Sequence, residues 1–454
     1  MTTPKNSRER SALAFDIFHG PVPGSFAAAA RDGVGATATI FPPEGGMPER
    51  DAIEQLLRFG RVKSLSGKSA LALAGMSDLH PNHPIPVGAA LATPEGFVVP
   101  SAIGNDINCG MRLVRFELPR ELDEASLALA RASLREPLVD ARRDIPLEGR
   151  HYRMLFEEGP EAFARAGLPA AGLWRRLPPG AIERAAARSP ALQGFAGSSA
   201  RMPGFLLQDR LMREPGLGTL GSGNHFFELQ ALDQRLDRRR CHELGLDASP
   251  RALYGLIHTG WAREAWREAR QSAPEGIFTL EGAEAKFYLA AQWAAARYAW
   301  LDRMALQEMA RQALGDAFGA EVDAMTIADC SHNVAMLEEA RVIHRKGACR
   351  ACAGDVCLIP GSMGDYSFVA LGLGNQAALC SCSHGAGRSR ARGAASRAVG
   401  ASKLPFAAET LKGRRVSEEA PWNYMDVERG AAAQAAAGII APVARMRPLA
   451  TFKA

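Results

Sequence analysis

The stretch ALALAGMSDLHPNHPIPVGAALATPEGFVVPSAIGNDINCGMRLVRFEL, residues 70–118, decides the fold class of this chain. Short apolar runs alternate in it with Gly, Pro and Asn, which is typical of strands joined by tight loops. The same pattern returns at residues 216–262 and 325–390. These three stretches together predict a strand-rich core.

Helical patterns flank this core. Apolar residues at helical spacing predict helices at 48–59, 121–134, 179–188, 280–314 and 391–401, and a helix before a final strand in the tail 432–454. We expect one catalytic domain over residues 1–454, with a variable helical segment at about 120–215. Strands and helices do not alternate as regular βαβ units. The expected fold class is therefore α+β with flanking helices, and neither a Rossmann nor a P-loop fold.

The helix predicted at 280–314 has the clearest helical pattern of the chain. Its aromatic side chains are expected in the core rather than on a nucleotide platform: Phe287, Trp293, Tyr298 and Trp300.

The composition is that of a globular enzyme. The chain has 454 residues, a net charge of +5 and 47% hydrophobic residues, so an anionic partner such as RNA is permitted but not required. The polar start, residues 1–10, predicts no signal peptide, and no run of about 20 apolar residues predicts a membrane span. Eight dispersed cysteines are then expected as reduced thiols in the cytoplasm.

Six polar clusters combine metal-competent side chains with glycines, and they contain six of the ten histidines. They are DLHPNHPIPVG (78–88), NDINCGMR (105–112), GSGNHFFE (221–228), HTG (258–260), DCSHN (329–333) and SHGAGR (383–388). The spacing Asp106–x–x–Cys109 can turn a carboxylate and a thiolate toward one ion, and neutral imidazoles from other strands can complete such a site. Thiolate and imidazole ligands favour zinc, whereas a thiolate that bridges two ions suits phosphoryl transfer.

These motifs resemble those of the RtcB RNA ligases. The resemblance rests on DLHP, DINCGM, GSGNHF, HTG, HRKGA (344–348), PGSMGDYSF (360–368), SHGAGR, NYMDVE (423–428) and VARMRPLATFK (443–453), which occur in the family's order from about residue 70 to the C-terminus. It implies a GTP- and Mn-dependent ligase that joins RNA 2′,3′-cyclic phosphate or 3′-phosphate ends to 5′-hydroxyl ends. The implied partners are RNA, GTP and an accessory activating protein. The resemblance implies no association with a membrane.

The resemblance also implies a role for each matching residue. Cys109 would bridge two Mn²⁺ ions, with Asp106 and His225 completing one shell and His258 and His332 the other. His384 would attack the α-phosphate of GTP and become a histidine–GMP phosphoramidate. The guanylate site would comprise Asn224, Glu228, Pro360, Gly361, Ser362, Met363, Gly364, Gly385, Ala386, Gly387, Arg388, Tyr424 and Lys453, and Lys346 would be a further phosphate partner.

Several positions depart from the family pattern. Asn108 stands where Gly is usual, although Asn tolerates a positive φ better than most residues. The family commonly has HSGSR where this chain has HTGWAR, so Trp261 replaces a small residue and Ala262 replaces Arg, with Arg263 one position later. Arg297 stands in the long helix where Asn is typical. RNA handling is expected to differ near residues 261–262.

Two further groups of residues carry minor hypotheses. A zinc site at Cys349, Cys352 and Cys357 is disfavoured, because no fourth ligand is evident. Buried thiols are expected at Cys380 and Cys382. His80 and His83 are expected to fix loops or support the ligands rather than bind the metal themselves.

Three other functions remain alternatives. One is a specialised paralogue in RNA repair, and another is a metal-dependent phosphodiesterase or phosphatase that has lost ligation. The third is a non-catalytic nucleotide- or RNA-binding protein. Retention of every implied metal ligand and of His384 argues against this last function.

Overall fold

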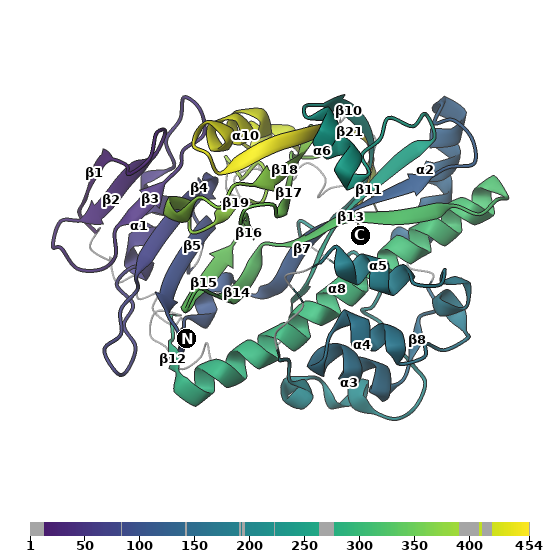
Figure 1. Cartoon of the computed structure of the whole chain (residues 1–454), viewed down its shortest axis with the longest axis horizontal. Helices are drawn as coiled ribbons and strands as arrows, with labels where there is room; N and C mark the ends of the chain where they lie inside the picture. Colours follow the sequence, from purple (N-terminus) through teal and green to yellow (C-terminus); the bar gives the residue numbers. More distant parts are fainter. Residues whose placement is uncertain are drawn as a thin grey trace, which may run out of the picture.

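A computed structural model describes residues 13–82, 84–140, 143–189, 192, 196–221, 223–262, 277–389, 408–410 and 420–453, without the side chains of residues 261 and 262. Two large β-sheets form the body of the molecule, and a long helix, α8 (Gly282–Phe318), runs diagonally below them (Figure 1). The α+β prediction is thereby confirmed.

The first sheet has seven strands. Their order is β1 (Phe15–His19), β2 (Phe26–Ala30), β3 (Ala38–Ile40), β4 (Ala72–His80), β5 (Val87–Pro94), β15 (Arg341–Lys346) and β14 (Asn333–Glu338). Neighbouring strands are antiparallel except for the parallel pair β3 and β4. Helix α1 (Arg50–Phe59) buries Leu56 and Leu57 among the apolar side chains of this sheet.

The second sheet has eight strands. Their order is β13 (Asp323–Ser331), β7 (Asp106–Glu117), β11 (Ala252–Ala262), β10 (Phe226–Arg235), β21 (Ile440–Lys453), β18 (Ser367–Gly372) and β17 (Val356–Pro360), and β20 (Ala408–Thr410) pairs with β21. Three small sheets pair β6 (Phe97–Val98) with β12 (Leu280–Glu281), β8 (Pro146–Leu147) with β9 (Met212–Arg213), and β16 (Ala348–Arg350) with β19 (Ser381–Ser383).

The two large sheets share one hydrophobic cluster. It contains Met76 and Ala90 of the first sheet together with Met111, Leu256 and Met446 of the second. Antiparallel strands that bury one face alternate inward and outward side chains, and these inward faces meet here. The shared cluster therefore holds the two sheets against each other.

Helix α8 is buried along most of its length. From Gln292 to Arg311 every side chain is buried, and Trp293 and Trp300 are among the largest. One side of α8 packs with α2 (Glu124–Leu138) against the second sheet, and another packs against α3 (Gly149–Glu157), α4 (Pro160–Arg165) and α5 (Ala181–Ala187). None of the helices in the described part of the chain is both long and apolar enough to cross a membrane.

The helices agree largely with their sequence patterns. The predictions at 48–59, 121–134, 179–188 and 280–314 correspond to α1, α2, α5 and α8, and the tail forms α10 (Val427–Ala436) before β21. A further helix is α6 (Arg238–Leu244). The core prediction for the aromatic residues of α8 is wrong for Phe287, which is 42% exposed beside Arg201, and confirmed for Trp293, Tyr298 and Trp300. The helix predicted at 391–401 lies outside the described residues.

Candidate active site

The expected metal ligands come from four neighbouring strands of the eight-stranded sheet. Asp106 and Cys109 lie at the start of β7, and His258 lies in β11. His225 directly precedes β10, and His332 directly follows β13. Because β13, β7, β11 and β10 are consecutive in the sheet, these ligands, which are distant in sequence, lie together at one end of the four strands.

Cys109 is at the centre of these ligands. Its Sγ lies 3.4 Å from Nε2 of His225 and 3.1 Å from Nε2 of His258. His225 Nε2 is 2.7 Å from Oδ2 of Asp106, and His258 Nε2 is 3.3 Å from Nε2 of His332. Two groups with metal-binding geometry result, Asp106–Cys109–His225 and Cys109–His258–His332, and they share the thiol.

The protonation states of these groups suit a cation. Nδ1 of His258 faces the carbonyl of Asn224, which can only accept, so a neutral ring directs the Nε2 lone pair toward Cys109. Burial holds the pKa of His258 and of His332 well below the usual range. Burial also raises the pKa of the Cys109 thiol, so a nearby cation is needed to favour its thiolate. Oδ1 of Asp106 is buried without a hydrogen-bond partner among the described residues. This donor set fits metal ions.

Two small features shape the β7 end of the site. Asn108 has a φ of 52°, as its place in a usual glycine position predicts, and its side chain is fixed by Ser331 Oγ and the Ala296 carbonyl. A Cβ on Gly260 would lie 2.4 Å from Oδ1 of Asp106. The glycine of HTG therefore lets the ligand strands approach each other.

His384 lies beside these ligands but is held from the other sheet. Its Nδ1 is 2.6 Å from Oδ2 of Asp78, which lies in β4, and its backbone N–H donates to the same oxygen. The His384 ring is 4.8 Å from the ring of His332. With Nδ1 protonated and directed to Asp78, the Nε2 lone pair of His384 is available as a nucleophile.

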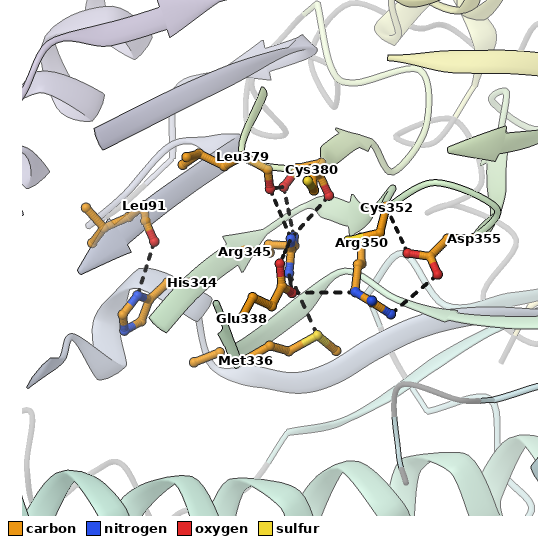
Figure 2. Close-up of polar contacts among 12 residues, drawn as sticks. Leu91, Met336, Glu338, His344, Arg345, Arg350, Cys352, Asp355, Leu379 and Cys380 are labelled. Atoms are coloured by element: carbon orange, nitrogen blue, oxygen red, sulfur yellow. Dashed lines mark hydrogen bonds and ion pairs between the residues drawn. The ribbon is translucent and has the colours of Figure 1, made fainter. Parts of the chain in front are cut away.

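A strained turn leads to His384, and Arg345 holds it (Figure 2). Leu379 and Cys380 both have positive φ, 51° and 45°. The buried guanidinium of Arg345 donates to both of their carbonyls, at 3.1 and 3.2 Å, and to Ser381 Oγ at 2.8 Å. Glu338 forms an ion pair with Arg345, with 2.6 Å between Oε1 of Glu338 and Nη1 of Arg345. Such backbone conformations persist where surrounding contacts fix them, and this clamp lies just before β19 and His384.

A cavity of about 670 Å³ opens over the cluster. Most of the predicted site residues line it: Asp106, Cys109, Asn224, His258, His332, Pro360, Gly361, Ser362, Met363, His384, Gly385, Ala386, Gly387, Arg388, Tyr424 and Lys453. His225, Glu228 and Gly364 do not line it, although His225 contacts Asp106 and Cys109.

Glu228 lies behind the cavity wall. Its two carboxylate oxygens accept hydrogen bonds from Gln230 Nε2 and Thr451 Oγ1, both at 2.8 Å. Burial raises the pKa of Glu228 to about 7. A guanine contact by Glu228 stays a prediction, and it requires the carboxylate to exchange these partners.

Three cationic side chains stand around the cavity. Arg388 donates to the Tyr424 hydroxyl at 3.0 Å, with its guanidinium over the Tyr424 ring. Lys453 Nζ donates to the Gly223 carbonyl at 2.6 Å, and Lys346 Nζ donates to the Ile85 carbonyl at 2.7 Å. Their positive charges suit phosphate groups in the cavity.

Several other positions singled out in the sequence lie in or beside the motifs of the site. His80 lines the cavity, and its Nδ1 is 2.7 Å from the Asp78 carbonyl, in agreement with a loop-fixing role. His83 and Arg263 lie outside the described residues. The backbones of residues 261 and 262 pair with Ile107 and Asp106 of β7, so these two altered positions adjoin the ligand strand.

Among the described residues the cysteine triplet does not form a group with metal-binding geometry, and both groups that do contain Cys109. Cys357 Sγ donates instead to the Arg350 carbonyl. The Cys352 N–H donates to Asp355 (Figure 2). Cys380 and Cys382 are buried as expected.

Sequence patterns gave no role to Asp78, although it lies in the DLHP motif beside His80. Its position in that motif was an available signal, but its contact with His384 joins β4 to the residue directly after β19, more than 300 residues away in sequence. Such a contact has no local spacing pattern.

Comparisons with known proteins place the sequence in one family. The family model described as tRNA-splicing ligase RtcB matches residues 61–454. A tRNA-splicing ligase RtcB from Pyrobaculum aerophilum is 29% identical over 446 residues, covering 83% of this chain and 87% of the relative. Another from Archaeoglobus fulgidus is 29% identical over 458 residues, covering 89% and 91%. The RNA-splicing ligase RtcB of Mycobacterium tuberculosis is 30% identical over 449 residues, covering 83% and 96%.

Proposed function

Because the chain belongs to the RtcB family, we propose that it is a GTP- and Mn-dependent RNA ligase working through a histidine–GMP intermediate. The observation that carries the proposal is the position of His384. Its ring contacts that of His332, beside a cluster suited to two metal ions, while Asp78 orients its Nδ1. A nucleophile beside a polarising cation site suits nucleotidyl transfer.

The proposed roles follow the positions of the residues. Asp106, Cys109 and His225 would hold one ion, and Cys109, His258 and His332 the other. When bound, Mn²⁺ would neutralise phosphate oxygens during in-line displacement, and zinc is the alternative by ligand chemistry. Arg388, Lys346 and Lys453 would bind phosphates, and the predicted lining residues would hold the guanylate.

The reaction then has four displacements at phosphorus. Nε2 of His384 attacks the α-phosphate of GTP, and pyrophosphate leaves. An RNA 2′,3′-cyclic phosphate is hydrolysed to a 3′-phosphate, whose oxygen takes GMP from His384. A 5′-hydroxyl then attacks the activated 3′-phosphate, so the strands join and GMP leaves.

The setting of the reaction is also part of the proposal. The eight cysteines are free, and Cys109 must be reduced to bind a metal, which favours the cytoplasm. We treat residues 1–454 as one catalytic domain whose variable helical segment is at about 120–215. RNA with the stated ends and GTP are the proposed partners, and an accessory activating protein is another.

A specialised repair enzyme is the second candidate. It is favoured by Trp261 and Ala262, which stand beside the ligand strand where the family pattern has a small residue and an Arg. A guanylylating enzyme with altered RNA handling would result.

One assay series separates these functions. The protein is incubated with Mn²⁺ and GTP labelled at the α-phosphate, and acid-labile label on the protein is measured. Wild type and the exposed-histidine control His242→Ala should carry label, and His384→Ala should not. RNA with cyclic-phosphate and 5′-hydroxyl ends is then added.

Label with joining supports the ligase, and label without joining supports the specialised enzyme. Opening of the cyclic phosphate with no label indicates a phosphodiesterase. Undiminished label on His384→Ala would contradict both guanylylating functions.

A further inference from the structure

Helix α8 carries two adjacent charged residues, Asp302 and Arg303, in the middle of its buried length. Their exposures are 4% and 0%. The helix passes beneath the strands that carry the metal ligands (Figure 1). Neither side chain lines the cavity, so neither is positioned to touch a substrate.

Arg303 joins three of the ligand segments. Its Nη1 donates to the Asn108 carbonyl at 3.2 Å and to the Thr259 carbonyl at 3.0 Å. Asn108 directly precedes Cys109, and Thr259 directly follows His258. The Nε and Nη2 atoms of Arg303 donate to Asp329 at 3.1 and 2.7 Å. Asp329 lies near the end of β13, the strand that leads to His332.

Asp302 reaches the fourth segment. Its Oδ1 accepts the N–H groups of Gly218 and Thr219, at 2.8 and 3.3 Å. The next carbonyl, that of Leu220, lies 3.0 Å from Nδ1 of His225. Asp302 therefore fixes the loop that orients His225.

The chemistry of the two side chains fits this task. A guanidinium offers several donors in one plane, so it can bind a carboxylate and two carbonyls together, which a lysine ammonium on a flexible stem cannot reproduce. A buried ion pair adds little net stability, because desolvation offsets the attraction, and conformational specificity is its better-supported role. Arg112 also donates to Asp329 at 2.8 Å and completes the buried network.

We propose that Asp302 and Arg303 are positioning residues that set the geometry of the metal ligands from one turn of α8. The inference rests on the proposed metal site. Arg303 acts on the residues of both ion sites through Asn108, Thr259 and Asp329. Asp302 acts on His225 through the loop at Gly218–Leu220, and therefore on one of the two sites.

The test measures metal binding directly, by calorimetric titration of the full chain with Mn²⁺ alone and with Zn²⁺ alone. The variants are Arg303→Lys, Asp302→Ala and Asp302→Asn. The control is Arg311→Lys, a buried arginine of the same helix that pairs with Glu308 and donates to Arg176. Melting temperature and circular dichroism are recorded for each.

Loss of a residue that supports metal ligands typically weakens metal affinity about 10–100-fold, and we expect this at both sites for Arg303→Lys. Asp302→Ala should reduce the stoichiometry from two ions toward one. Asp302→Asn should restore it, because an amide oxygen accepts the same backbone N–H groups. Arg311→Lys should bind as wild type does.

Wild-type affinity in a folded Arg303→Lys protein overturns the role of Arg303, and two-ion binding by Asp302→Ala overturns that of Asp302. If Arg303→Lys does not fold, the Asp302 pair decides the inference. An equal loss of metal affinity in Arg311→Lys would show that the loss in Arg303→Lys comes from a general destabilisation of α8. That result would overturn the proposal. Wild type that binds neither metal would overturn the proposed site itself, a result distinct from all of these.

Discussion

The two halves of the active site come from different sheets and are held in different ways. The metal-ligand half uses consecutive strands of the eight-stranded sheet and is tied from below by Asp302 and Arg303 of α8. The nucleophile half is held from the seven-stranded sheet, where Asp78 orients His384 and Arg345 fixes the turn before it. The ring contact between His332 and His384 joins the halves.

Because the two halves are supported by different residues, we expect that mutations can separate metal binding from guanylyl transfer. A change in the metal-ligand half should remove both, because the proposed reaction depends on the ions. A change in the nucleophile half should remove guanylyl transfer and leave the metal bound. The predictions below test that asymmetry, from the largest expected effect to the smallest.

Cys109→Ala should have the largest effect, because Cys109 belongs to both ligand groups. We expect metal content to fall below one ion per chain and adduct formation to fall by at least about 10⁴-fold, as for loss of a central catalytic group. Elemental analysis and labelled GTP measure the two quantities. Cys241→Ala is the matched control, a buried cysteine in α6, and it should change neither.

Asp78→Asn should slow adduct formation about 10²–10⁴-fold, because an amide no longer selects the productive tautomer of His384. Metal content should stay at the wild-type level. Single-turnover labelling with GTP gives the rate, and elemental analysis gives the metal. Loss of metal in this variant would show that the halves are not separable.

Arg345→Lys should weaken the strained turn without emptying the metal site. Loss of the paired contacts to the Leu379 and Cys380 carbonyls should cost about 2 kcal/mol of unfolding free energy, at about 1 kcal/mol per hydrogen bond. We expect a roughly tenfold slower adduct rate, equivalent to about 1.4 kcal/mol of barrier. Chemical denaturation and labelling measure these.

Arg350→Lys is its control, since the Arg350 side chain pairs with Glu338 and Asp355 and, among the described residues, makes no side-chain hydrogen bond to that turn. An equal slowing in both variants would count against the clamp.

The smallest effect concerns pH. The pKa of Glu228 is raised to about 7 by burial, so its proton is lost only as the pH rises through about 7. If the carboxylate accepts the guanine edge, GTP affinity should fall as the pH drops below 7, by up to about tenfold per unit. Calorimetric titration of GTP from pH 5.5 to 8.5 checks this. Glu228→Gln should abolish the dependence, and an unchanged profile would exclude Glu228 from guanine binding.

The same raised pKa has a consequence for folding. Because the folded-state pKa lies above the ordinary carboxyl value, the proton bound to Glu228 stabilises the fold at low pH. That contribution is fully present below about 4.5 and is lost as the pH rises through about 7. If Glu228 binds guanine, its ionisation would favour ligand binding and weaken the fold in the same pH window.

The sequence was sufficient for the α+β class and for much of the site. Asp106 and Cys109 are close in sequence, and the histidines stand in glycine-flanked motifs, so local spacing pointed to them. The unusual Asn108 was expected to tolerate a positive φ, and it does. Short loops with chemically specialised residues leave a strong local pattern.

The supporting residues left no such pattern. Helix α8 is buried on all sides, so Asp302 and Arg303 do not stand out from a polar face. Arg345 lies in the HRKGA motif, but its contact with the turn at Leu379 depends on the position of β15 relative to β19. Glu228 matched the family motif, yet Gln230 and Thr451 occupy its oxygens. These facts follow from tertiary packing, which a single sequence does not contain.

The most direct test of the account is the location of the guanylate on the protein. Wild-type protein treated with Mn²⁺ and GTP is digested at alkaline pH, which preserves a phosphoramidate, and the modified peptide is sequenced by tandem mass spectrometry. The account predicts one GMP on His384, bonded through Nε2 because Nδ1 faces Asp78. GMP on any other residue, or an unmodified His384 at saturating GTP and Mn²⁺, would contradict it.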